Sequence, residues 1–137
     1  MADETQTVSG GCLCGAIRYT ATGAPKGAGY CHCRSCRRHT GAPLVAFAVF
    51  SADQVDWPSG ERARYQSSPG IFRAFCRECG ASLSFEGRFG GEDLVELHIS
   101  TLDDPEAFPP QEHTHYKERI SWLHVDDDLP KFPGSMT

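Results

Sequence analysis

The chain has 137 residues, of which 39% are hydrophobic and 23% charged, and its formal net charge is −5. This length predicts one domain, and the acidic balance argues against general binding to nucleic acid, which requires a basic surface. The first residues lack the basic start and apolar run of a signal peptide, and no segment approaches the roughly 18 apolar residues of a membrane span. We therefore expect a cytoplasmic protein without a membrane partner.

Short strands separated by turns dominate the pattern along the chain. β-Branched and aromatic residues predict strands at 16–22, 44–50, 54–57, 62–66, 71–75, 82–85, 94–99 and 113–117, with an extended segment at 30–33. Glycines and a proline predict a loop at 23–29. Short helical turns are expected at 35–40 and at 104–108, where Asp104 can cap the turn that Pro105 begins. The pattern indicates an all-β domain of mainly antiparallel strands.

Seven cysteines form two pairs and a triple: Cys12 with Cys14, Cys76 with Cys79, and Cys31 with Cys33 and Cys36. In a reducing compartment such clusters are more typical of metal sites than of disulfides, and an odd number of cysteines cannot pair completely. Zinc held by four protein ligands is structural, whereas zinc held by three keeps one position open. The grouping therefore predicts one structural ion and one ion that can take part in chemistry.

The two pairs can together bind the first ion. Residues 76–80, with the sequence CRECG, have the form of a zinc knuckle, because two residues between the sulfurs allow a tight turn and Gly80 can adopt a positive φ. Cys12 and Cys14 are two residues apart, so on a strand their side chains would share one face and supply the other two ligands. Such a site would close a long loop and stabilise a small domain.

The triple can bind a second ion unaided. Residues 31–36 read CHCRSC, so Cys31 and Cys33 are expected on one strand face and Cys36 on the following turn. Because no fourth cysteine remains, a thiol, a water or a carbonyl oxygen could occupy the open position and be polarised there. A metal ion would also keep an incoming thiol deprotonated and ready to attack an aldehyde carbon.

Basic residues and histidines near the triple are candidates for contact with a substrate. Arg34, Arg37 and Arg38 could offset the net charge of about −1 on three thiolates and Zn²⁺, or hold an anionic substrate. His39 and His113 could transfer protons near neutral pH. Without such roles, the segment 34–39 would be a solvated turn and each histidine a surface or hydrogen-bonding residue.

Other interpretations of the cysteines stay open. The pairs can be ordinary buried thiols, or a metal site can combine cysteines of the triple with cysteines of the pairs. A histidine can also supply the fourth ligand of the triple, and the candidates are His32, His39, His113 and His115. The protein can be a non-catalytic zinc-binding interaction module with two structural ions. It can also be a redox or formaldehyde sensor that uses the triple without metal, which mild oxidation would reveal as a disulfide.

The cysteines lie within three longer motifs, GCLCGAIRY at 11–19, CHCRSCRR at 31–38 and RAFCRECG at 73–80. TLDDP at 101–105, His113, Trp122 and Leu-Pro at 129–130 follow in order. Together these residues, from about Gly10 to Phe132, resemble the glutathione-dependent formaldehyde-activating enzyme family, which includes centromere protein V.

The resemblance implies a β-tent fold with one zinc at each cysteine group. The structural zinc would be held by Cys12, Cys14, Cys76 and Cys79, and the second, which can be labile, by Cys31, Cys33 and Cys36. It also implies a carbon–sulfur lyase-type enzyme that combines glutathione and formaldehyde reversibly to S-hydroxymethylglutathione. We accordingly expect one zinc-binding domain at residues 10–132, after a flexible N-terminus at 1–9 and before a C-terminal tail at 133–137.

Overall fold

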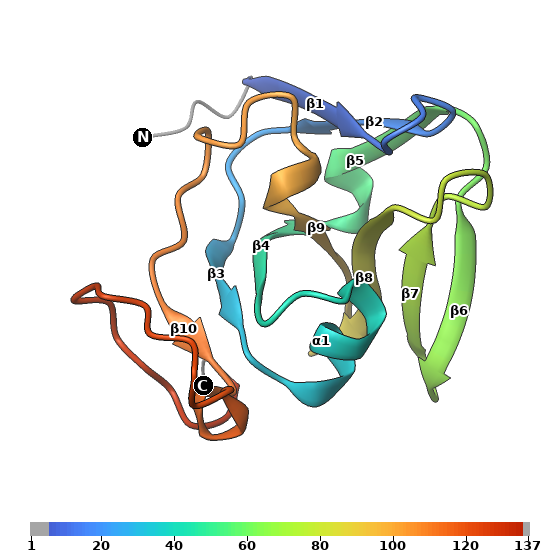
Figure 1. Ribbon diagram of the computed structural model, residues 1–137. Helices are drawn as coiled ribbons and strands as arrows, with labels where there is room; N and C mark the ends of the chain where they lie inside the picture. The colour runs from blue at the N-terminus through green and yellow to red at the C-terminus, as the bar shows by residue number, and fades with distance from the viewer. Residues whose placement is uncertain (1–5, 136–137) are drawn as a thin grey trace.

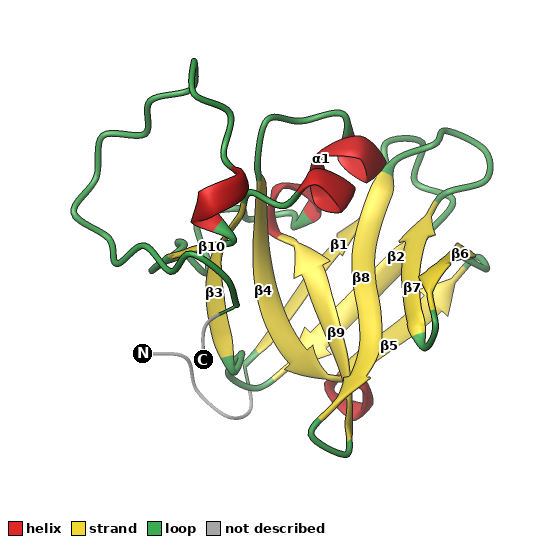
Figure 2. Ribbon diagram, turned by 90° about the horizontal axis from the view of Figure 1, so that it is seen from below, coloured by secondary structure: helices red, strands yellow, loops and turns green. Residues whose placement is uncertain are grey.

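Two β-sheets form the fold in the computed structural model, which describes residues 6–135 (Figures 1 and 2). The smaller sheet has the order β1-β2-β5 and consists of β1 (Thr7–Gly11), β2 (Arg18–Thr22) and β5 (Val55–Ser59). The larger sheet has the order β10-β3-β4-β9-β8-β7-β6. Its strands are β3 (Gly27–Cys31), β4 (Val45–Ser51), β6 (Ala63–Ser68), β7 (Ile71–Phe75), β8 (Ser82–Phe89), β9 (Glu92–His98) and β10 (His113–Thr114).

The helical content is small. The α-helix α1 (Arg34–Thr40) lies at one end of the large sheet (Figure 2) and ends at Gly41, whose φ of 71° is left-handed. Three 3₁₀ turns complete the elements, η1 (Ala52–Gln54), η2 (Ile99–Thr101) and η3 (Tyr116–Glu118). β10 pairs with β3 in parallel and the other strand pairs are antiparallel. The predicted all-β, mainly antiparallel class is confirmed.

Strand β4 is covered on both faces and shows where the core lies. Ala48 and Phe50 pack with Tyr19 in the cluster between the two sheets, whereas Phe47 and Val49 pack with the three-cysteine segment on the opposite face. A central strand that is buried on both sides needs no polar alternation. This explains the continuous apolar run at 44–50 and gives the large sheet a second face on which a site can be built.

One strand was not predicted, and another begins earlier than predicted. β1 starts at Thr7, inside the segment expected to be flexible, because it pairs with β2 along its whole length from Thr7 opposite Thr22. β3 starts at Gly27 in the predicted loop, where pairing with β4 overrides the low strand propensity of glycine. A Cβ atom at Gly29 would lie 3.0 Å from both the side chain and the backbone oxygen of Glu112, so this position needs glycine.

Two other predicted elements are shorter or looser. The strand expected at 113–117 has two residues, because His115 adopts a φ of 51° and a 3₁₀ turn follows. The turn at 104–108 does not continue into a helix, although the Asp104 carboxylate accepts a hydrogen bond from the Glu106 N–H (3.0 Å) as a cap would. Within residues 6–135, no helix has the length and apolar character needed to cross a membrane.

Candidate functional site

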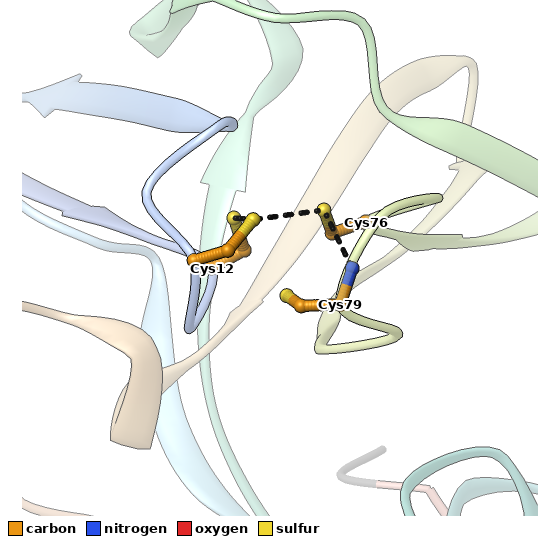
Figure 3. A group of neighbouring side chains, drawn as sticks. Cys12, Cys76 and Cys79 are labelled. Atoms are coloured by element: carbon orange, nitrogen blue, oxygen red, sulfur yellow. Dashed lines mark hydrogen bonds between the residues drawn. The ribbon is translucent and has the colours of Figure 1, made fainter.

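Four cysteines converge from the loops that follow β1 and β7, as Figure 3 shows. All four sulfurs lie within 4.8 Å of one another, and Cys14 Sγ is 3.6 Å from Cys12 Sγ and 3.8 Å from Cys76 Sγ. Cys79 is the fourth member. Thiolates about 2.3 Å from a tetrahedral zinc ion are roughly 3.8 Å apart. The group therefore has the geometry of a four-ligand metal site.

Backbone N–H groups favour the thiolate form of these cysteines. The N–H of Ile17 donates to Cys12 Sγ at 3.2 Å. The N–H groups of Ala81 and then Cys14 lower the pKa of Cys79 to about 6. Because the thiolate is the form that binds metal, these N–H groups favour metal binding at Cys12 and Cys79, whereas, against the hydrogen bond from the Ala16 N–H, the neighbouring thiol of Cys12 raises the pKa of Cys14 to about 11.

The first pair lies in a turn and not on a strand, so the strand-face argument for it was wrong. β1 ends at Gly11, and the Gly15 N–H donates to the Cys12 carbonyl at 3.3 Å. In the same way the Gly80 N–H donates to the Cys76 carbonyl at 2.8 Å. Both glycines have a left-handed φ, 82° and 78°, which allows the chain to reverse. The site is therefore built from two similar knuckles.

The other three cysteines meet where β3 leads into α1. Cys31 ends the strand, Cys33 is the N-cap of the helix and Cys36 lies in its first turn, so that the three sulfurs lie within 4.8 Å of one another. Cys33 thus caps α1 instead of sharing the strand, and its Sγ accepts a hydrogen bond from the Cys36 N–H (3.3 Å). Among residues 6–135, no histidine or carboxylate ligand atom joins this group. A metal ion bound there would have three cysteine ligands.

The three thiols differ in pKa. Hydrogen bonds from Cys31 and then Cys36 lower the pKa of Cys33 to about 2, whereas contact with Cys33 first and Cys36 second raises the pKa of Cys31. Cys33 is therefore the first of the group to carry a negative charge.

A buried arginine contacts the third cysteine of the group, Cys36. Arg73 on β7 donates from Nη1 to Cys36 Sγ at 3.3 Å and from Nε to Ser67 Oγ at 3.1 Å, and its guanidinium lies 5.0 Å from the ring centre of Phe85. Only 7% of Arg73 is exposed, and a buried cation requires an anionic partner. A thiolate cluster provides one. Arg73 thus occupies the charge-balancing position that we expected an arginine next to the triple to fill.

The three cysteines line a pocket of about 350 Å³ on the face of the large sheet that is turned away from the small sheet. Its apolar lining includes Phe47, Ile71, Phe85 and Phe89, and its charged or titratable lining includes Arg73, Glu96 and His115. A largely apolar pocket with a few converging polar groups is the usual form of a small-molecule site.

The arginines predicted to bind substrate lie outside the lining of this pocket. Arg37 donates from Nε to the His32 carbonyl (3.2 Å) and from Nη2 to the Glu118 carbonyl (3.3 Å), and so it ties the cysteine segment to η3. Arg38 is exposed. A direct role of either residue with substrate stays a prediction.

The predicted proton-transfer histidines also lie elsewhere. His39 lines a separate pocket with His98, their ring centres 6.0 Å apart, and burial lowers the pKa of His39. His113 is fully buried, with Nδ1 2.8 Å from His32 Nε2 and Nε2 2.9 Å from Asp127 Oδ2. His113 connects the C-terminal segment to the residue between two of the cysteines. Its role in proton transfer stays a prediction.

Among the charged or titratable side chains that line the pocket, sequence reasoning did not single out Arg73 and Glu96. Arg73 stands in the RAFCRECG motif, but nothing in its local spacing connects it to Cys36, 37 residues away. Glu96 leaves a trace in the sequence, since it is a carboxylate between Val95 and Leu97, which belong to the core. His115 was one of the histidines considered as a closing ligand of the triple, but its place in the pocket depends on the turn after β10.

An all-β domain with one four-cysteine group and one three-cysteine group that opens into a pocket defines a class of small proteins with two cysteine groups that could each hold a metal ion. The model of one family, the glutathione-dependent formaldehyde-activating enzymes, matches residues 7–118, and the chain belongs to this family. The family predicted from the sequence is confirmed.

Two individual proteins are also similar to the chain. An uncharacterized lyase of Schizosaccharomyces pombe is 34% identical over 76 residues, which cover 56% of this chain and 55% of the relative. The chain thus matches about half the length of that curated relative. The crystal structure of a Rhodobacter sphaeroides protein superposes with a TM-score of 0.57 at 20% identity, covering 90% of this chain and 98% of the other. At this identity the likeness concerns the fold alone.

Proposed function

We propose that the protein is a zinc-dependent carbon–sulfur lyase-type enzyme that forms or cleaves an adduct between a small thiol such as glutathione and an aldehyde such as formaldehyde. The observation that carries the proposal is the three-cysteine group at the wall of a pocket of about 350 Å³. Membership of the formaldehyde-activating family and the lyase name of the relative support the same reaction class.

Zinc at Cys31, Cys33 and Cys36 would supply the chemistry of an open metal site, which holds a thiol as its thiolate or polarises a carbonyl oxygen. The residues of the chain support this chemistry in two ways. Arg73 donates a hydrogen bond to the sulfur of Cys36 and so places a positive charge beside the group. The apolar side chains of the pocket lower the local polarity, which strengthens electrostatic interactions there.

In this proposal the two cysteine groups have separate roles. A zinc ion at the four-cysteine group connects the loop after β1 to the loop after β7, far from the pocket lining, and stabilises the domain. The three-cysteine group serves the reaction. The two groups share no residue, so changes to one can be separated experimentally from changes to the other.

The test replaces Cys33 by serine in zinc-loaded protein and measures adduct formation from formaldehyde and a panel of thiols, above the spontaneous rate. We expect turnover to be lost, the bound zinc to fall from two equivalents to one, and the unfolding midpoint to stay near that of the wild type. Unchanged turnover in the variant would exclude the zinc mechanism. If the wild type acts on none of the thiols, the protein is instead an interaction module with two structural ions.

A further inference from the structure

Glu96 lies in one row of side chains that crosses the large sheet. In the strand register Val49 is opposite Glu96, Glu96 is opposite Phe85, and Phe85 is opposite Arg73. Residues that are directly opposite in antiparallel strands point to the same face. This row therefore places the Glu96 carboxyl on the pocket face, separated by one strand from the arginine that contacts the cysteines, and Glu96 lines the pocket.

The Glu96 carboxyl is left without a protein partner. Among residues 6–135, the structure contains no hydrogen bond or ion pair to its oxygens, although the side chain lies in an apolar part of the pocket. Glu86, a buried carboxylate on the neighbouring strand, shows the ordinary arrangement, since it accepts hydrogen bonds from Arg62 Nε (2.8 Å) and Ser84 Oγ (2.7 Å). Glu96 is half-buried, so its unpaired oxygens can be reached from the pocket, which is the position of a group that meets a ligand.

The surroundings of Glu96 suit a group that both gives and takes a proton. Burial raises its pKa to about 7, with the positive charge of Arg73 from β7 opposing the rise and the thiolate of Cys33 from the start of α1 adding to it. His115, which follows β10, also lines this pocket. A carboxyl with a pKa near neutrality populates its acid and its base forms at once, which is the condition for efficient acid–base catalysis.

We propose that Glu96 is the catalytic residue that transfers the proton between thiol and aldehyde, an inference that rests on the proposed function. The Glu96 carboxylate takes the proton of the incoming S–H group. The sulfur electron pair then forms the bond to the aldehyde carbon, and the C=O π pair moves to the oxygen, which receives the same proton from Glu96. The carboxylate is regenerated, so thiol plus aldehyde gives the hydroxyalkyl thioether with no other reactant. Cleavage follows the same steps in reverse.

The other polar side chains of the pocket fit this role less well. Arg73 is permanently protonated and already donates to Cys36 and Ser67. His115 Nδ1 lies 3.5 Å from Glu118 Oε2, outside the row of side chains that contains Glu96. Glu96 is therefore the carboxyl of this pocket that is free to meet the substrate.

The test is Glu96→Gln, which keeps the size and hydrogen-bonding capacity of the side chain but cannot transfer the proton. We expect kcat to fall by about 10²–10⁴-fold while KM for the thiol changes little. The inflection that the wild-type pH–rate profile should show near pH 7 should disappear. Glu92→Gln is the matched control, because Glu92 lies on the same strand but is exposed and contacts Ser51 and Lys26 outside the pocket. It should keep wild-type kinetics.

A second variant separates proton transfer from packing. Glu96→Asp keeps a carboxyl on a shorter stem, and it should recover part of the rate together with the pH inflection. The role of Glu96 would be overturned if the glutamine and aspartate variants lost the same amount of activity. It would also be overturned if Glu96→Gln kept the wild-type rate and pH profile. In both cases turnover by the wild type would still support the proposed function. Absence of turnover in the wild type with every thiol would overturn both.

Discussion

Replacing Glu96 by glutamine should change how the stability of the protein depends on pH, whether or not a substrate is present. Burial raises the pKa of the Glu96 carboxyl from 4.5 to about 7 in the folded protein. Between these values the folded protein holds this proton and the unfolded chain does not. The free energy of unfolding of the wild type therefore falls as the pH rises through this window, and the variant lacks this contribution.

The magnitude follows from the same two values. At about 1.4 kcal/mol for each pKa unit, the difference between 4.5 and about 7 corresponds to roughly 3 kcal/mol. The quantity to compare is the free energy of unfolding of Glu96→Gln minus that of the wild type. This difference should be larger above about pH 7 than near pH 4.5 by about this amount. The gain comes from removing a charge that the wild type holds half-buried and without a protein partner in the pocket.

Urea unfolding of both proteins at about pH 5 and about pH 8 measures the effect as the difference between variant and wild type. Taking this difference cancels the contribution of groups that titrate alike in both proteins. Glu92→Gln is again the control. The Ser51 hydroxyl and then Lys26 lower the pKa of Glu92 from its ordinary value of 4.5, so its contribution to stability changes only below that pH, and the difference between this variant and the wild type should be nearly equal at about pH 5 and about pH 8. A gap between Glu96→Gln and wild type that is equal at both pH values would refute the reasoning.

Two further substitutions test the interior and the four-cysteine group. Tyr19→Phe should lower the free energy of unfolding by about 1 kcal/mol, because it removes the 2.6 Å hydrogen bond to Thr101 Oγ1 from a fully buried side chain. A urea midpoint equal to that of the wild type would contradict this. Cys14→Ser should lower it by up to about 4 kcal/mol and reduce the bound metal, because Cys14 and Cys76, 62 residues apart, would no longer be connected through an ion. Full metal content together with wild-type stability would disprove a structural crosslink.

The grouping of the cysteines could be predicted because metal-ligand spacing is a short-range property. Two residues between Cys76 and Cys79 allow both sulfurs to reach one ion in any fold that permits the turn, and the turn needs the glycine that follows. The same spacing did not reveal the local conformation of Cys12 and Cys14. A strand and a knuckle both bring residues two apart to one side, and only the backbone distinguishes them.

The sequence by itself determined the class of the fold, the family and the two groups of cysteines, since these depend on residue type and on spacing along a few residues. The tertiary structure alone decided which charged groups meet the three-cysteine site. Arg73 and Glu96 reach it through the register of β7, β8 and β9, and pairing between strands far apart in the chain is set by the packing of the whole sheet. For the same reason two predicted residues help to hold the site in place and do not line the pocket. The Arg37 side chain bonds to η3, and the His113 side chain bonds to the C-terminal segment.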